Sequence, residues 1–286
     1  MSREKHFVKL KLDIIFKKVF GDKNDTEALA SLLSALLEIP IEDMGEITLD
    51  NVEMPPELSD GKFGRLDLKL KLDDKTIDIE IQLTNESDFR ERSLYYWAKM
   101  FSRDLKSGEI YGKLSQTICI NIINFNMFEC EDYLSSFEII EKNRYERLSD
   151  KLAIHFFELK KVGKYPKHKP MDEWLTLINA ESEEELMSIE NNTSDKAIRK
   201  VALKLREYNA DELIQYQAEK REEALHEEAS KIASALAEGR AEGRAEGRAE
   251  GRAEGRAEGR ANYKSELIKK FKGLGMNEAE ISRLLS

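Results

Sequence analysis

Several features are scarce in this sequence of 286 residues, and each shortage excludes a class of protein. Two cysteines, Cys119 and Cys130, are too few for a disulfide framework, so we expect the reducing compartment of the cytoplasm. The four histidines show no Cys/His spacing that would indicate a zinc site. No apolar run reaches the roughly 18 residues that a membrane span needs, and the first residues are polar and basic. We therefore expect neither a membrane span nor a secretory signal.

Charged residues are abundant and mainly acidic. The 46 basic and 56 acidic side chains give a net charge of −10 at pH 7. A protein that grips nucleic acid through a general basic coat would have the opposite sign. An enzyme that contacts phosphates over a small patch, and uses metal ions for the rest, is compatible with this charge.

Composition divides the chain into four regions. Residues 1–180 hold all five prolines and nearly all the aromatic residues, so we expect the globular domain there. Residues 181–236 are rich in Glu, Lys, Ala and Leu, which predicts helix. Residues 237–260 are six copies of Ala-Glu-Gly-Arg, which could form a helix or a spacer. Residues 261–286 predict a small helical hairpin, too short to hold a core, so we expect a homo-oligomer joined through these C-terminal helices.

The clearest local pattern predicts a β-hairpin. Residues 65–72 and 76–83 each alternate polar and apolar side chains without an error. Burial of the Leu and Ile face fixes the register, because a shift by one residue would turn every apolar side chain to the wrong face. In that register Lys69 faces Asp78 across the ladder.

The elements around the hairpin predict the fold class. We expect a helix over residues 28–37, a weak strand over 46–54, a helix over 89–107, and buried strands over 117–125 and 152–159. The order α, β, β, β, α, β, with one further strand, predicts an α/β fold in which helices pack on a mixed sheet. A helical appendage follows at the carboxyl end.

The same register places Asp67 opposite Glu80. Cβ atoms of such a pair lie about 4.5–5.5 Å apart, and like charges at that distance destabilise a sheet. A divalent cation between the carboxylates would reverse the sign of the interaction, and Mg²⁺ binds one or two carboxylates together with water and phosphate oxygens. The alternative is a solvated sheet face on which the two acids have no function.

The helix expected over residues 89–107 carries two stripes. Leu94, Trp97 and Phe101 form an apolar stripe that we expect to face the sheet. A basic stripe with one tyrosine is predicted on the opposite side, where it would suit phosphate groups. Its members are Arg92, Tyr96, Lys99, Arg103 and Lys106. The alternative is an ordinary solvated helix face.

Together these residues resemble a known arrangement. An Asp on one strand and Glu-x-Lys on the next, with a helix before and after, form the core pattern of the PD-(D/E)XK nuclease superfamily. The pattern stands here as Asp67 followed by Glu80-Ile81-Gln82. More narrowly, roughly residues 5–180 resemble the Rpn family of recombination-promoting nucleases and transposases. The segments that carry this resemblance are residues 11–21, 64–68, 79–82 and 92–99.

The resemblance implies a metal site. Asp67 and Glu80 would hold Mg²⁺, with Mn²⁺ as a substitute. Asp13, in the family's amino-terminal motif, would add a third carboxylate. The alternative for Asp13 is the cap of a helix start.

The resemblance also implies how charge on the phosphate is offset. Gln82 takes the place of the lysine in the superfamily pattern, and an amide can orient water but carries no charge. Lys69, on the same face, would supply the missing charge. Arg92 is the member of the basic stripe that would face the site.

The function that follows is a Mg²⁺-dependent DNA endonuclease of the Rpn type, which hydrolyses phosphodiester bonds and promotes recombination. The catalytic residues would be Asp67, Glu80, Gln82 and Lys69. One alternative is a catalytically weak or silent module with the nuclease fold that binds DNA or protein, in a mobile element or in phage defence. Another is an assembly protein whose helical tail does the work.

Overall fold

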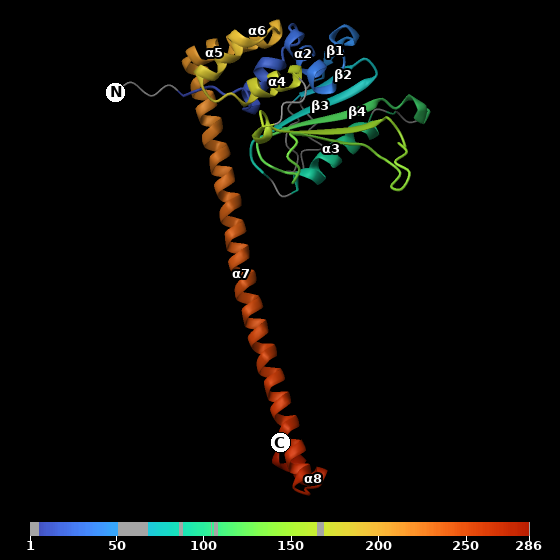
Figure 1. The fold of residues 1–286 in the computed structure, drawn as a ribbon, viewed down its shortest axis with the longest axis vertical. Helices are drawn as coiled ribbons and strands as arrows, with labels where there is room; N and C mark the ends of the chain where they lie inside the picture. Colours follow the sequence, from blue (N-terminus) through green and yellow to red (C-terminus); the bar gives the residue numbers. More distant parts are fainter. Residues whose placement is uncertain are drawn as a thin grey trace, which may run out of the picture. The chain divides into compact units, whose positions relative to one another are not determined.

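A mixed β-sheet organises the amino-terminal part of the chain (Figure 1). The computed structural model describes residues 6–50, 68–85, 88–103, 105, 108–164 and 169–285. The chain divides into two compact units, Met1–His226 and Glu227–Ser286. Among the described helices, none is long and apolar enough to cross a membrane.

The sheet has six strands in the spatial order β1-β2-β3-β4-β6-β5. The first three strands pair antiparallel, β3, β4 and β6 run parallel, and β5 pairs antiparallel with β6. The predicted α/β fold with a mixed sheet is confirmed. The strands are β1 Ile47–Leu49, β2 Leu68–Leu72, β3 Lys75–Gln82, β4 Gln116–Ile123, β5 Leu134–Phe137 and β6 Leu152–Glu158.

The hairpin of β2 and β3 has the predicted register. Lys69 is the partner of Asp78, and Leu72 is the partner of Lys75, which leaves a two-residue turn. Asp73 opens that turn with a φ of 51°, the left-handed conformation that tight hairpin turns require and that Asp tolerates better than most residues. The register was predictable because one apolar face had to be buried.

Helices cover both faces of the sheet. Helix α3 (Phe89–Arg103) lies on one face, while α1, α2, α4 and α6 build the larger core with the other (Figure 1). Ile77, Ile79 and Ile81 of β3 point into that larger core. The helices of the first unit other than α3 are α1 Asp13–Phe20, α2 Glu27–Leu37, α4 Lys169–Asn179, α5 Glu183–Asn192 and α6 Lys196–Ala210. Within the described residues, short 3₁₀ helices span Ile41–Asp43, Tyr111–Lys113 and Leu159–Lys161.

The region expected to be helical after residue 180 is broken into separate helices. Ser182 caps α5 through the backbone N–H of Glu185, and Asp195 caps α6 through the N–H groups of Ala197 and Ile198. Ile198, Val201 and Leu205 of α6 are buried in the same core as the sheet. The core therefore continues beyond residue 180, where the sequence predicts a boundary.

The repeats and the tail are helical. Helix α7 (Glu212–Gly273) contains all six Ala-Glu-Gly-Arg copies, and α8 is Glu278–Leu284. Gly275, at a φ of 83°, makes the turn between the two helices. Asn277 caps α8 in a capping box with Glu280, so the predicted glycine turn and cap are confirmed.

Candidate active site

Glu80 lies on the face of the sheet that α3 covers. The side chains of β3 alternate, so Glu80 shares this face with Asp78 and Gln82, opposite the isoleucines of the larger core. Glu80 is 8% exposed and Asp78 is 1% exposed. The polar face of the hairpin is therefore covered rather than solvated, at least along β3. Asp67, the predicted partner of Glu80, lies outside the described residues.

Cys119 is a buried thiol on the same face, and its pKa is raised. It lies on β4 beside Asp78 and is buried. Burial raises the pKa of its thiol well above the ordinary value, and the charges of Asp78 and Glu80 raise it further. The thiol therefore stays neutral.

Gln82 is fixed at the carboxyl end of β3 by contacts at both ends of its amide. Its Nε2 donates to the carbonyl oxygen of Thr84 at 3.0 Å and lies 3.1 Å from Thr84 Oγ1. Its Oε1 accepts a hydrogen bond of 3.0 Å from Nη2 of Arg92. The guanidinium carbon of Arg92 also lies 4.7 Å from the centre of the Phe89 ring. Gln82, which takes the place of the superfamily lysine, thus has Arg92 of α3 beside it.

Asn121 is a buried polar residue that sequence reasoning missed. It is the β4 neighbour of Glu80 and is 1% exposed. Its Oδ1 accepts from Ser93 Oγ at 3.0 Å, and its Nδ2 donates to the carbonyl oxygen of His155 at 3.2 Å. The hydrogen bond to Ser93 ties α3 to the strand next to Glu80. An Asn inside an otherwise apolar strand was the signal that could have identified it.

The predicted inward face of α3 is wrong. The buried residues are Phe89, Ser93, Tyr96 and Met100, whereas Leu94 is 54% exposed. At about 100° per residue the buried arc lies between the two predicted stripes, so each stripe borders it. Trp97 and Phe101 stack on each other with ring centres 4.9 Å apart.

The basic stripe is correspondingly divided. Arg92 is half-buried and faces Gln82, and Tyr96 is buried against the sheet. The ammonium group of Lys99 lies 5.4 Å from the centre of the Tyr95 ring, and Arg103 is exposed. Lys106 lies outside the described residues. Only part of the stripe is therefore turned to solvent.

Lys69 and Asp13 each form an ion pair with a residue that was not predicted as part of the site. The ammonium group of Lys69 is 3.1 Å from Asp50 Oδ2. Asp13 is the first residue of α1, which follows Leu12 as the cap, and its Oδ1 accepts a hydrogen bond of 2.8 Å from Arg221 Nε. Neither predicted role is visible in these pairs.

The donors on the α3 face suit a hard divalent cation. Mg²⁺ prefers oxygen ligands, and Glu80 and Asp78 bring carboxyl oxygens to a buried face. Within the described ranges, which leave out Asp67, no group of three or more His, Cys, Asp or Glu side chains could hold a metal ion. A complete site therefore needs a ligand from the remaining residues or from substrate phosphates and water.

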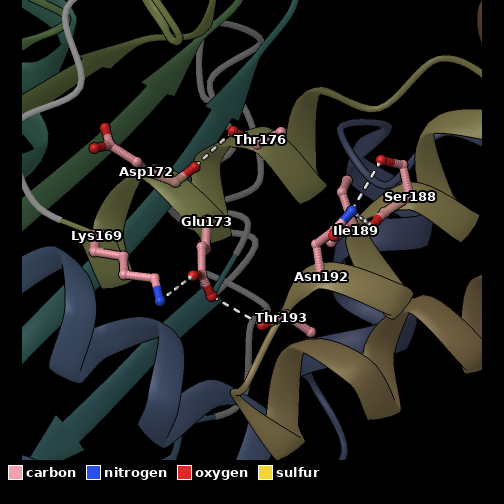
Figure 2. Close-up of a pocket in the computed structure, with 8 residues that line it drawn as sticks. All are labelled: Lys169, Asp172, Glu173, Thr176, Ser188, Ile189, Asn192 and Thr193. Atoms are coloured by element: carbon pink, nitrogen blue, oxygen red, sulfur yellow. Dashed lines mark hydrogen bonds and ion pairs between the residues drawn. The ribbon is translucent and has the colours of Figure 1, made fainter.

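A pocket of about 520 Å³ lies elsewhere, between α4 and the end of α5 (Figure 2). Its side chains bond to one another: Lys169 lies 3.6 Å from Glu173, and Glu173 accepts from Thr193 Oγ1 at 2.8 Å. Asn192 donates to the carbonyl oxygen of Ser188 at 2.7 Å. No residue of β3 or α3 is among those that line it. We therefore place the candidate active site on the α3 face.

Comparison with known proteins gave one match. Residues 10–235 match a family model described as PD-(D/E)XK nuclease family transposase. No curated protein matched, and no solved structure matched. The matched residues include β2, β3 and α3 and extend into α7.

Proposed function

This chain belongs to the PD-(D/E)XK nuclease family transposases, and we propose that it is a Mg²⁺-dependent DNA endonuclease that promotes recombination. The family indicates a nuclease that acts on DNA. The observation that carries the finer proposal is Glu80, a buried carboxylate beside an amide that an arginine holds in place. Two free thiols suit a reducing compartment, and we expect the protein to act in the cytoplasm.

We assign the metal ligands to Asp67 and Glu80, with Asp13 as a further candidate. The register of β2 and β3 supports the first two, because Leu68, the residue after Asp67, is already the partner of Ile79. When bound there, Mg²⁺ or Mn²⁺ would polarise the phosphodiester and lower the pKa of an attacking water. For Asp13, a ligand role requires that its ion pair with Arg221 opens.

Gln82 and Arg92 would act on water and charge. The amide of Gln82 is held at both ends, so it can present one orientation to a water molecule. Arg92 would offset negative charge that develops on the phosphate, together with Lys69 of β2. Lys99 and Arg103, on the solvent side of α3, would bind the DNA backbone. Tyr96 would hold α3 on the sheet, because its side chain is buried between the helix and the strands.

The test is nicking of supercoiled DNA with Mg²⁺ or Mn²⁺. We expect cleavage by the unaltered chain and its loss in Asp67→Asn and Glu80→Gln, with the fold retained. Asp74→Asn is the matched control, since Asp74 lies in the same hairpin and its side chain is 78% exposed. Equal cleavage by all four proteins would refute the assignment.

The second candidate function is a silent binding module. Gln82 at the lysine position and the net charge of −10 favour it. It predicts no cleavage with either metal, together with DNA binding in EDTA that is unchanged when Asp67 and Glu80 are both replaced. Metal-dependent cleavage by the unaltered chain excludes it.

We also propose that the C-terminal helices join copies of the chain. Among the described residues from 227 to 285, Ile281 is the one hydrophobic side chain that is buried, so this unit has almost no core of its own. Long helices without tertiary packing are marginal in water, and each glycine of the repeats costs about 1 kcal/mol relative to alanine. Packing against a second copy would supply the missing burial.

A further inference from the structure

Strand β5 leaves one edge of the sheet without a neighbouring strand. Among the described strands, β5 pairs with β6 alone, and it ends the spatial order of the sheet. Proteins usually protect such an edge with lysine, proline or a bulge. Residues 133–141 contain neither lysine nor proline. This edge is thus open to another strand.

The chain that follows β5 forms an ordered hairpin, whose first arm continues the edge and whose second arm returns toward β6. Leu148 N donates to Ile139 O at 3.0 Å, and Glu141 N donates to Glu146 O at 2.8 Å. Ile140 and Arg147 form an antiparallel bridge. The segment over residues 134–148 is called the β5 edge below. Because its backbone is already ordered, binding there would cost little conformational entropy.

The β5 edge exposes apolar side chains. Five large apolar side chains are exposed within these fifteen residues. Single exposed apolar residues are common on protein surfaces, whereas several in one segment indicate an interaction surface. They are Phe137 at 43%, Ile139 at 41%, Ile140 at 46%, Tyr145 at 80% and Leu148 at 76%.

The charges of the β5 edge balance. It carries Glu138, Glu141 and Glu146 against Lys142, Arg144 and Arg147. Arg147 lies 2.7 Å from Glu138, and Arg144 lies 3.4 Å from Glu146. The chain as a whole has a net charge of −10, so two copies repel each other over most of their surface. At this neutral segment, most of whose charges are paired within each copy, that repulsion is absent. DNA finds no excess of positive charge here.

We propose that the β5 edge binds the same edge of a second copy of this chain. The two β5 strands would run antiparallel across a two-fold axis, so that the sheet continues from one copy into the next. Main-chain hydrogen bonds would give the pairing its direction, and the exposed apolar side chains would be buried. This interface is separate from the C-terminal helices.

The backbone identifies which amides report the pairing. Glu158 N donates to Tyr133 O, so Tyr133 is in a hydrogen-bonded pair with β6 and alternate residues from it are as well. Ser135 therefore directs its N–H to β6, whereas Leu134 and Ser136 direct theirs outward. In the dimer the outward amides would be covered.

Hydrogen exchange of the full chain tests this at several protein concentrations. We expect exchange at Leu134 and Ser136 to slow as concentration rises, while Ser135 is protected throughout. Association through the C-terminal helices alone would leave exchange at Leu134 and Ser136 independent of concentration, and that result would overturn the proposal.

Sedimentation of variants gives the second readout. Ile140→Lys should weaken self-association about tenfold or more, because it puts a charged side chain among the apolar side chains that the pairing would bury. Leu203→Lys is the matched control, since Leu203 on α6 has a similar exposure of 42%. A distribution of masses in Ile140→Lys equal to that of the control and of the unaltered chain would contradict the interface.

Discussion

Arg92 is the residue on which the candidate chemistry depends most after the carboxylates. It reaches Gln82 from another element, at 3.0 Å, and brings the charge that Gln82 lacks. We expect Arg92→Gln to lower the rate of cleavage by about 10²–10³-fold, the usual effect of losing one donor to a developing charge. The measurement is the single-turnover rate at which supercoiled plasmid is nicked.

A control variant that loses one positive charge elsewhere distinguishes a role of Arg92 in the site from an effect of net charge. Lys113→Gln removes one positive charge at a side chain that is 63% exposed and pairs with Glu109. We expect its rate to change little. If both variants lost the same activity, Arg92 would act through net charge alone, and its assignment to the site would be wrong.

His155 gives the fold a pH dependence. Burial lowers the pKa of His155 below its ordinary value of 6.5, against a weaker opposing effect of Glu138. Below pH 6.5 the unfolded chain therefore binds more protons at this residue than the folded chain does. The free energy of unfolding should fall as pH drops from 6.5 towards the lowered pKa.

The comparison that isolates this effect is the melting temperature of the unaltered chain and of His155→Gln between about pH 8 and pH 5. Gln can keep a hydrogen bond with Ser136, which now lies 2.9 Å from His155 Nδ1. We expect the unaltered chain to lose more stability than the variant at the acidic end. Parallel curves would show that His155 does not titrate differently on folding.

At the scale of elements, patterns that one buried face controls were predictable. The register of β2 and β3 follows from alternation, and Asn277 as the cap of α8 follows from local chemistry. The inward face of α3 did not follow, because Ser93 and Tyr96 turn inward to polar partners and the sheet, while Leu94 stays in solvent. Hydrophobic periodicity depends on apolar residues alone, so it does not predict a buried polar pair such as Ser93 and Asn121.

The same limit explains β5. Its residues Leu-Ser-Ser-Phe carry little apolar alternation, and the strand is defined by pairing with β6. Within the candidate site, Glu80 and Gln82 were predictable from the hairpin, and Arg92 from the resemblance. Asn121 was not, because its role arises from the neighbouring strand and from α3.

The loop after β4 depends on a buried ion pair. Lys161 Nζ lies 2.6 Å from Glu158 Oε2, and the side chains are 6% and 0% exposed. Glu158 also accepts from Met127 N, and Lys161 donates to Phe128 O. Glu158→Gln should reduce the free energy of unfolding by about 3–5 kcal/mol, because it leaves a buried ammonium group without its counter-charge.

Denaturation in urea, followed by tryptophan fluorescence, measures this loss, since both tryptophans lie in the first unit. The double variant Glu158→Gln with Lys161→Met should be more stable than Glu158→Gln alone, because it removes the buried charge as well. A double variant that is less stable than the single one would contradict the account of the pair.

At the scale of the whole molecule, an acidic chain has to approach an acidic polymer. With 56 acidic side chains and a net charge of −10, the protein has no general attraction for DNA. A metal ion between the hairpin acids would reverse the local field where the phosphate must come. We therefore propose that Asp67 and Glu80 form a specific site for a divalent cation.

Calorimetric titration of Mn²⁺ tests this claim most directly. An acidic protein binds cations weakly at many places, so the comparison needs Asp67→Asn, Glu80→Gln and the exposed control Asp74→Asn beside the unaltered chain. We expect one tight site in the unaltered chain and in Asp74→Asn, and its loss in the other two variants. The same tight binding in all four proteins, or in none, would contradict it.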